Sequence, residues 1–152
     1  MDIEGQVSFV DLQSFLEELV EKDMTPAKSE DIQTLPHALQ ELYALGEGID
    51  LPFGYVYTIA QIQENSKIAP FFPDWLVFGQ DPYGVFWVCR KEPNAEGFSF
   101  TTWDHDFETE IDAPIFADVL SFLDDLEDDY LDFMETMKSE WDNLENDDMA
   151  IE

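Results

Sequence analysis

Basic side chains are scarce in this sequence: six Lys or Arg stand beside 36 Asp or Glu, and the formal net charge is −30. Proteins that hold DNA or RNA need clustered Lys and Arg to contact the phosphates. The composition therefore excludes direct nucleic-acid binding. The acidity is uneven, because 21 of the acidic residues lie within residues 92–152, where Lys138 is the single base.

A surface of one charge attracts a partner of the opposite charge and speeds their encounter. We therefore expect a basic protein as the partner of this chain. Repulsion between copies with this charge favours a monomer or, at most, a weak homodimer. The alternative interpretation is that the acidity serves solubility alone.

Cysteine and long apolar runs are also rare. Cys89 is the only cysteine, so no intrachain disulfide can form, and its place in the apolar run 85–89 predicts a small buried hydrophobe. The first four residues carry no basic signal-peptide region. No apolar stretch reaches the length of a bilayer span. These absences predict a cytoplasmic protein that does not bind membranes.

Aromatic residues, by contrast, are plentiful: 13 Phe, 5 Tyr and 4 Trp in 152 residues. Disordered acidic chains are poor in aromatics, whereas a chain of this length and composition can bury a core. The length predicts one domain, which we place at residues 1–142. An acidic tail at residues 143–152 is expected to fray.

Hydrophobic periodicity predicts helices, then strands, then helices again. Helical spacing occurs at 8–20, after Thr25 and Pro26, from Pro36 to Leu45, and from Pro114 onward, while the polar segment 61–68 fits a short helix. Strands are expected at 55–60, 75–78, 85–90 and 98–103, with Gly79 ending the second. The predicted fold class is α+β, with a central antiparallel or mixed sheet of about four to six strands flanked by helices.

Patterns for catalysis and metal binding are weak. Asp104, His105 and Asp106 offer carboxylate and imidazole ligands to a divalent ion. On a strand, however, the two aspartates share one face and His105 lies on the other. The sequence has no G-x-S-x-G, P-loop or G-x-G-x-x-G motif, and Cys89 has no electropositive neighbour other than Arg90 and Lys91, which point elsewhere or lie at the strand end. We therefore predict no cofactor, no metal site and no enzymatic activity.

Four segments, in their order along the chain, resemble the SUKH superfamily. Residues 35–48 (LPHALQELYALGEG) are similar to its Leu-Pro helix with a glycine end, and residues 76–87 (LVFGQDPYGVFW) to its strand–Gly–turn–Gly–strand core. Residues 102–106 (TWDHD) resemble its late strand, and residues 115–123 (IFADVLSFL) its closing helix. The resemblance covers residues 26–127, with Gly-Glu-Gly at 46–48 where the family has Asn-Gly.

The resemblance implies an α+β fold, a variable binding surface and no shared catalytic residues. Bacterial members of the superfamily are mostly immunity proteins that bind and neutralise polymorphic toxins, often nucleases, and fungal relatives are regulatory binding proteins. The expected function is therefore an immunity protein whose acidic surface occludes the active site of a cognate, basic, nuclease-type toxin. The alternative is an acidic nucleic-acid mimic or regulator that sequesters a DNA- or RNA-binding protein.

Aromatic residues beside charges of the right sign are typical anchors of protein interfaces. Tyr83 lies in a segment dense in turn-forming residues, where we expect exposure. Trp103, at the end of the fourth predicted strand, is either an anchor or a part of the core. The predicted partner-binding residues are Asp81, Tyr83, Trp103, Asp104, Asp106, Glu108 and Glu110.

Overall fold

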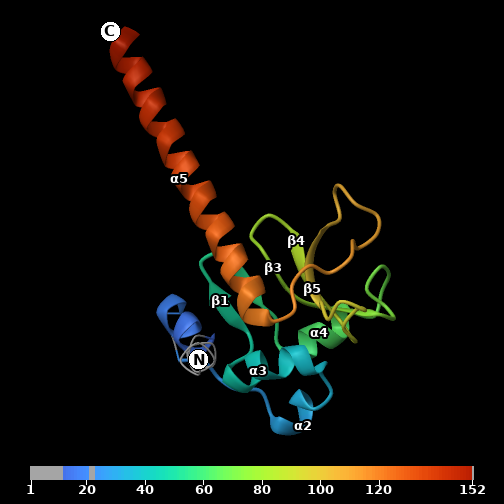
Figure 1. The fold of residues 1–152 in the computed structure, drawn as a ribbon. Coiled ribbons are helices and arrows are strands. Elements are labelled where there is room, and N and C mark those ends of the chain that lie inside the picture. The colour runs from blue at the N-terminus through green and yellow to red at the C-terminus, as the bar shows by residue number, and fades with distance from the viewer. Residues whose placement is uncertain (1–11, 21–22, 152) are drawn as a thin grey trace. The chain divides into compact units, whose positions relative to one another are not determined.

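The computed structural model describes residues 12–20 and 23–151, with side chains through residue 140. Residues 8–11, the start of the first predicted helix, lie outside the described residues, and residues 12–19 are helical as predicted. The chain forms two compact units, Met1–Phe122 and Leu123–Glu152. Residue 142, where the sequence analysis ends its single domain, lies inside helix α5 (Val119–Ile151), which Figure 1 shows in orange and red.

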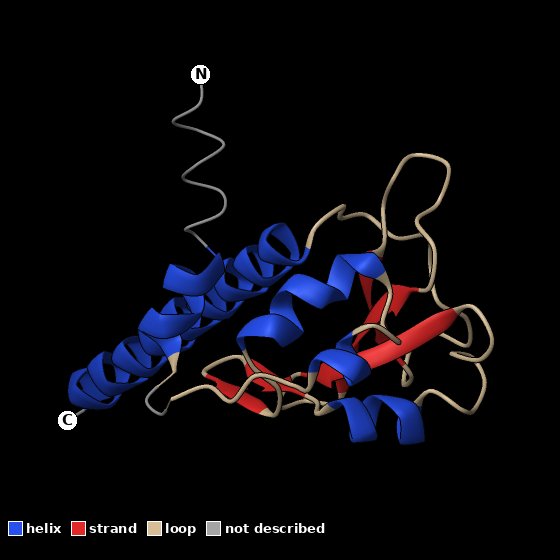
Figure 2. Ribbon diagram, turned by 90° about the horizontal axis from the view of Figure 1, so that it is seen from below, coloured by secondary structure: helices blue, strands red, loops and turns tan. Residues whose placement is uncertain are grey.

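The first unit is built on an antiparallel sheet in which strands adjacent in sequence are hydrogen-bonded neighbours. Figure 1 labels four of its strands, and Figure 2 draws the strands in red. This topology confirms the predicted α+β fold with a central antiparallel sheet and helices beside it. The strands are β1 (Ile49–Leu51), β2 (Gly54–Val56), β3 (Trp75–Gln80), β4 (Val85–Arg90) and β5 (Phe100–Asp104). The helices that precede or join them are α2 (Ser29–Ile32), α3 (His37–Leu45) and α4 (Ile59–Asn65).

The core of this unit surrounds Trp87 in the middle of β4. Its ring lies 5.9 Å from that of Phe53 and 6.3 Å from those of Phe78 and Phe122, measured between centroids. A side-chain carbon at Gly79 would overlap the indole, so this position in β3 has room only for glycine. The prediction that Gly79 ends its strand is therefore wrong. The glycine is needed by packing inside β3 and not by a turn.

The first hairpin differs from the prediction of one strand over residues 55–60. Strand β2 ends at Val56, and a short strand β1, missed by the sequence analysis, pairs with it. Helix α4 begins directly after Thr58, whose hydroxyl accepts a hydrogen bond from the Gln61 amide at 3.2 Å. The Gln61 side chain in turn accepts one from the Thr58 amide at 2.8 Å. This capping box starts the helix and overrides the alternating pattern.

Helix α2 also starts later than predicted. The amide of Ala27 donates to the Tyr43 carbonyl at 3.1 Å, and the Glu47 amide donates to the Thr25 carbonyl at 3.0 Å. These bonds tie residues 25–27 to the end of α3, so that segment stays extended where Thr25 and Pro26 suggested a helix start. Helix α3 itself occupies the predicted position after Pro36.

The last helix begins at Val119 and not at Pro114. The amides of Ile115 and Phe116 donate to the Phe100 carbonyl at 2.9 and 3.2 Å, which adds this segment to the edge of β5. The Asp118 carboxylate then accepts from the Ser121 amide at 2.8 Å and forms the cap of α5. Of the helices in the described part of the chain, none, including the 33-residue α5, has the length and apolar character that a bilayer crossing requires.

Candidate protein-binding surface

Two loops lie together at one end of the sheet, and we call them the acidic end: the β3–β4 turn at residues 81–84 and the segment at residues 104–112. The antiparallel register of β4 and β5 pairs Val85 with Asp104, so the turn and the segment leave the sheet side by side. The surface holds six carboxylates and two exposed aromatic rings. Its acidic residues are Asp81, Asp104, Asp106, Glu108, Glu110 and Asp112.

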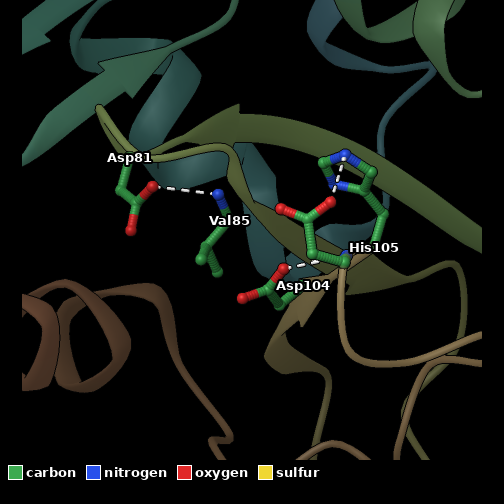
Figure 3. A network of polar contacts seen from close by, with 5 residues as sticks. Asp81, Val85, Asp104 and His105 are labelled. Carbon is green, nitrogen blue, oxygen red and sulfur yellow. Dashed lines mark hydrogen bonds and ion pairs between the residues drawn. The ribbon is translucent and has the colours of Figure 1, made fainter.

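The β3–β4 turn is organised by Asp81. One carboxylate oxygen accepts hydrogen bonds from the amides of Tyr83 at 2.8 Å and Val85 at 2.9 Å, the second of which is drawn in Figure 3. Gly84 completes the turn with a φ of 90°, a conformation that side chains disfavour. The turn holds Tyr83 with 70% of its surface exposed, as predicted. Asp81 itself is half-buried and shapes the turn.

The segment after β5 turns sharply, and the alternation expected for a strand ends at Asp104. The Asp104 carboxylate accepts from the Asp106 amide at 3.0 Å, and its carbonyl accepts from the Glu108 amide at 2.9 Å. The His105 ring therefore lies beside Asp106, with Nε2 3.4 Å from a carboxylate oxygen (Figure 3). The prediction that His105 faces away from both aspartates is wrong, because the backbone leaves the strand conformation at this point.

This turn brings possible ligand atoms of Asp104, His105 and Asp106 within 4.8 Å of one another. In the part of the chain that the structure describes, this is the one group of three such residues that could hold a metal ion. Two of the three side chains are exposed and the third is half-buried. Exposed groups of this composition are common in acidic loops, and the arrangement by itself points to charge display and not to a built metal centre.

Trp103 lies beneath this surface and not on it. Only 9% of the residue is exposed. Its ring stacks on Phe86 at 6.0 Å and meets the edge of Phe71 at 5.3 Å. Of the two roles considered for Trp103, the structure places it in core packing, where it supports the strand that carries the acidic segment.

The outer part of the acidic end consists of residues 106–112. Asp106, Glu110 and Asp112 are exposed, and Glu108 is half-buried. A hydrogen bond with the Asp112 carboxyl, together with that group's negative charge, raises the pKa of Glu108. The carboxylates are thus close enough to oppose one another's ionisation, and a cation placed here would relieve that repulsion.

Phe107 is the residue of this surface that the sequence analysis missed. It is 86% exposed, the most of any large apolar residue in the described part of the chain. The sequence did contain a signal for this exposure, because Phe107 has acidic neighbours and no apolar periodicity around it. With Tyr83 it supplies a second exposed ring at the acidic end, and large exposed apolar side chains beside charge mark interaction sites.

The Cys89 thiol lies in an environment that disfavours its ionisation. The thiol is buried in β4, and that burial raises its pKa to about 12. A thiol in this state carries almost no thiolate at neutral pH.

Comparisons of the chain with family models, with curated proteins and with solved structures find no match. The resemblance to the SUKH superfamily stays a prediction that depends on the four motifs quoted above.

Proposed function

We propose that this protein is a non-catalytic binding protein of the immunity type, which neutralises a basic, nuclease-type toxin in the cytoplasm by covering its active-site cleft. The observation that carries the proposal is the acidic end itself. Six carboxylates and the exposed rings of Tyr83 and Phe107 lie together on a turn and a segment at one end of the sheet.

The acidic end offers a partner both negative charge and apolar anchors. A nuclease cleft is lined with cations because it holds phosphates, so a carboxylate-rich surface is complementary to it. Charge pairs across such an interface speed association and can couple strongly once water is excluded. The exposed rings of Tyr83 and Phe107 add apolar contact on the same surface, as anchors of interfaces commonly do.

The backbone of this surface is already arranged for binding. Asp81 and Asp104 each accept hydrogen bonds from the backbone of their own loop, and Asp106, Glu110 and Asp112 remain exposed. A surface that is ordered before binding loses less conformational entropy when the partner arrives. The proposed mechanism therefore needs no rearrangement of the sheet.

Affinity capture from the source cells tests the proposal. The tagged chain is expected to recover a basic nuclease, and adding the chain to that recovered protein at equal molar ratio is expected to abolish its nuclease activity. The affinity should fall steeply as salt rises through ~0.1 M, where the Debye length is about 10 Å.

A matched pair of variants separates local charge from total charge. The acidic-end variant neutralises Asp106, Glu108, Glu110 and Asp112 as D106N/E108Q/E110Q/D112N. The control removes the same number of exposed charges elsewhere, as E30Q/E41Q/D50N/D74N. Inhibition that is lost in the first variant and kept in the second supports the proposal. Equal inhibition by both variants, or binding that does not respond to salt, contradicts it.

The same experiment addresses the alternative function. A nucleic-acid mimic or regulator would recover a DNA- or RNA-binding protein without toxic activity, and would compete with nucleic acid for it. That outcome would replace the immunity proposal while keeping a basic partner.

A further inference from the structure

Helix α5 exposes apolar side chains along the part that belongs to the second unit. Every residue from 131 to 140 is exposed. Leu131, Met134 and Met137 are exposed by 52%, 46% and 38%. Exposed apolar side chains that follow one another along a helix mark a surface that another molecule covers.

Met134 and Met137 share a face of the helix with other apolar residues, and Leu131 lies outside that face. Residues three and four positions apart lie above one another on an α-helix, and the apolar positions of α5 recur at this spacing. The positions are Leu126, Tyr130, Phe133, Met134 and Met137, and the sequence continues the spacing at Trp141 and Leu144. The second unit is thus an amphipathic helix.

The charged residues of the helix are almost all negative. Within Val119–Ile151 the sequence has twelve Asp or Glu and one base, Lys138. The carboxylates already repel one another: burial and the charges of Asp129, Asp128 and Asp124 raise the pKa of Asp125. A second copy of the chain would place two such helices together, and this repulsion opposes that pairing.

We propose that α5 is a docking helix whose apolar face enters an apolar groove rimmed by Lys and Arg on a partner protein. Helices recognised in this way place apolar residues at i, i+3, i+4 and i+7 into the groove, and charges at the edge set the orientation. The inference rests on and extends the proposed function. The partner is again a basic protein, and α5 gives it a second contact, which is apolar.

The test uses a synthetic probe, so that it does not depend on the identity of the partner. The probe is a helical peptide of repeated heptads with Leu on one face and Lys on the other positions. A second peptide has Gln in place of each Leu and carries the same charge. The full chain is expected to bind the Leu peptide roughly tenfold more tightly than the Gln peptide at ~0.15 M salt, measured by fluorescence anisotropy.

Variants of the chain identify the face that binds. M134Q/M137Q removes two apolar side chains without changing the charge, and Gln is a helix former similar to Met. T136Q/S139Q is the control, with the same number of changes to Gln at exposed positions off the apolar face. The first variant should bind the Leu peptide roughly tenfold more weakly, and the control should bind it as the parent chain does.

Each other outcome overturns the inference. Equal affinity for both peptides, or equal binding by both variants, would mean that charge alone attracts the probe. A dimer of the parent chain in sedimentation equilibrium that is lost in M134Q/M137Q would assign the face to a second copy. The acidic-end variant should keep full affinity for the Leu peptide. A loss of toxin neutralisation in that variant would therefore be distinguishable from a loss of docking by α5.

Discussion

The two units of the chain differ in the burial of their apolar side chains. In Met1–Phe122 a cluster of large rings forms a core: Trp87, Phe78 and Phe100 are fully buried, and Phe78 and Phe100 lie 5.7 Å apart, although other rings of this unit, such as Phe107, are exposed. In Leu123–Glu152 the residues 131–140 are all exposed, apolar ones included. The difference indicates where the stability of the chain resides. The first unit supplies its own core, whereas an isolated helix is marginal in water and gains order from what it contacts.

Removing the central ring of the first unit should have the largest effect on stability. Trp87→Ala deletes the indole that Phe53, Phe78 and Phe122 surround and should lower the free energy of unfolding by about 3–5 kcal/mol. Met134→Ala in α5 should change it by less than about 1 kcal/mol, because that side chain is exposed. Urea denaturation followed by tryptophan fluorescence measures both. Similar losses of unfolding free energy in the two variants would contradict this difference between the units.

Thiol labelling should report on the first unit alone. Burial raises the pKa of Cys89 from 9.0 to about 12, so at mildly alkaline pH the native chain should react roughly a thousandfold more slowly with a disulfide reagent than the urea-unfolded chain. The reaction is measured by absorbance of the released thiol. Rapid labelling of the native chain would mean that β4 opens readily.

Shortening the chain after Tyr130 should have a small effect on the first unit. The residues removed belong to the exposed part of α5, so the free energy of unfolding should change by less than about 1 kcal/mol, and Cys89 should keep its slow labelling. Circular dichroism should show the loss of helix alone. A loss of more than about 2 kcal/mol would show that the first unit depends on the helix.

The smallest expected effect is a pH dependence of α5. Burial, and then the charges of Asp129, Asp128 and Asp124, raise the pKa of Asp125 in the helix. The helix therefore binds this proton more tightly than the unfolded chain does, so its stability should rise as pH falls through the raised pKa. The gain is complete below the ordinary pKa of an aspartate and absent well above the raised one. Helix content followed by circular dichroism should increase over that window, and less so in Asp125→Asn.

Much of the fold could be predicted because its signals are local. Helix α3 follows from apolar spacing after Pro36, and β4 from a continuous apolar run. The exposure of Tyr83 followed from its place in a turn. The acidic segment of the candidate surface was also predictable, since charge is a property of the sequence.

Other features could not be predicted because they depend on distant residues. In the sequence Gly79 is typical of a strand end, and only the structure shows the Trp87 indole beside it. The start of α5 is set by the pairing of Phe116 with Phe100. The grouping of His105 with Asp106 depends on a turn that the Asp104 carboxylate stabilises.

The sequence by itself determined the sign of the charge, its concentration in the second half of the chain, and the order of helices and strands apart from β1. These properties follow from amino-acid composition and hydrophobic periodicity alone. The tertiary structure decided which aromatic rings are core and which are exposed: Trp103 is buried under the acidic end, and Phe107 lies outside it. The physical reason is that burial depends on what packs against a residue, and the strand register that brings those partners together is long-range.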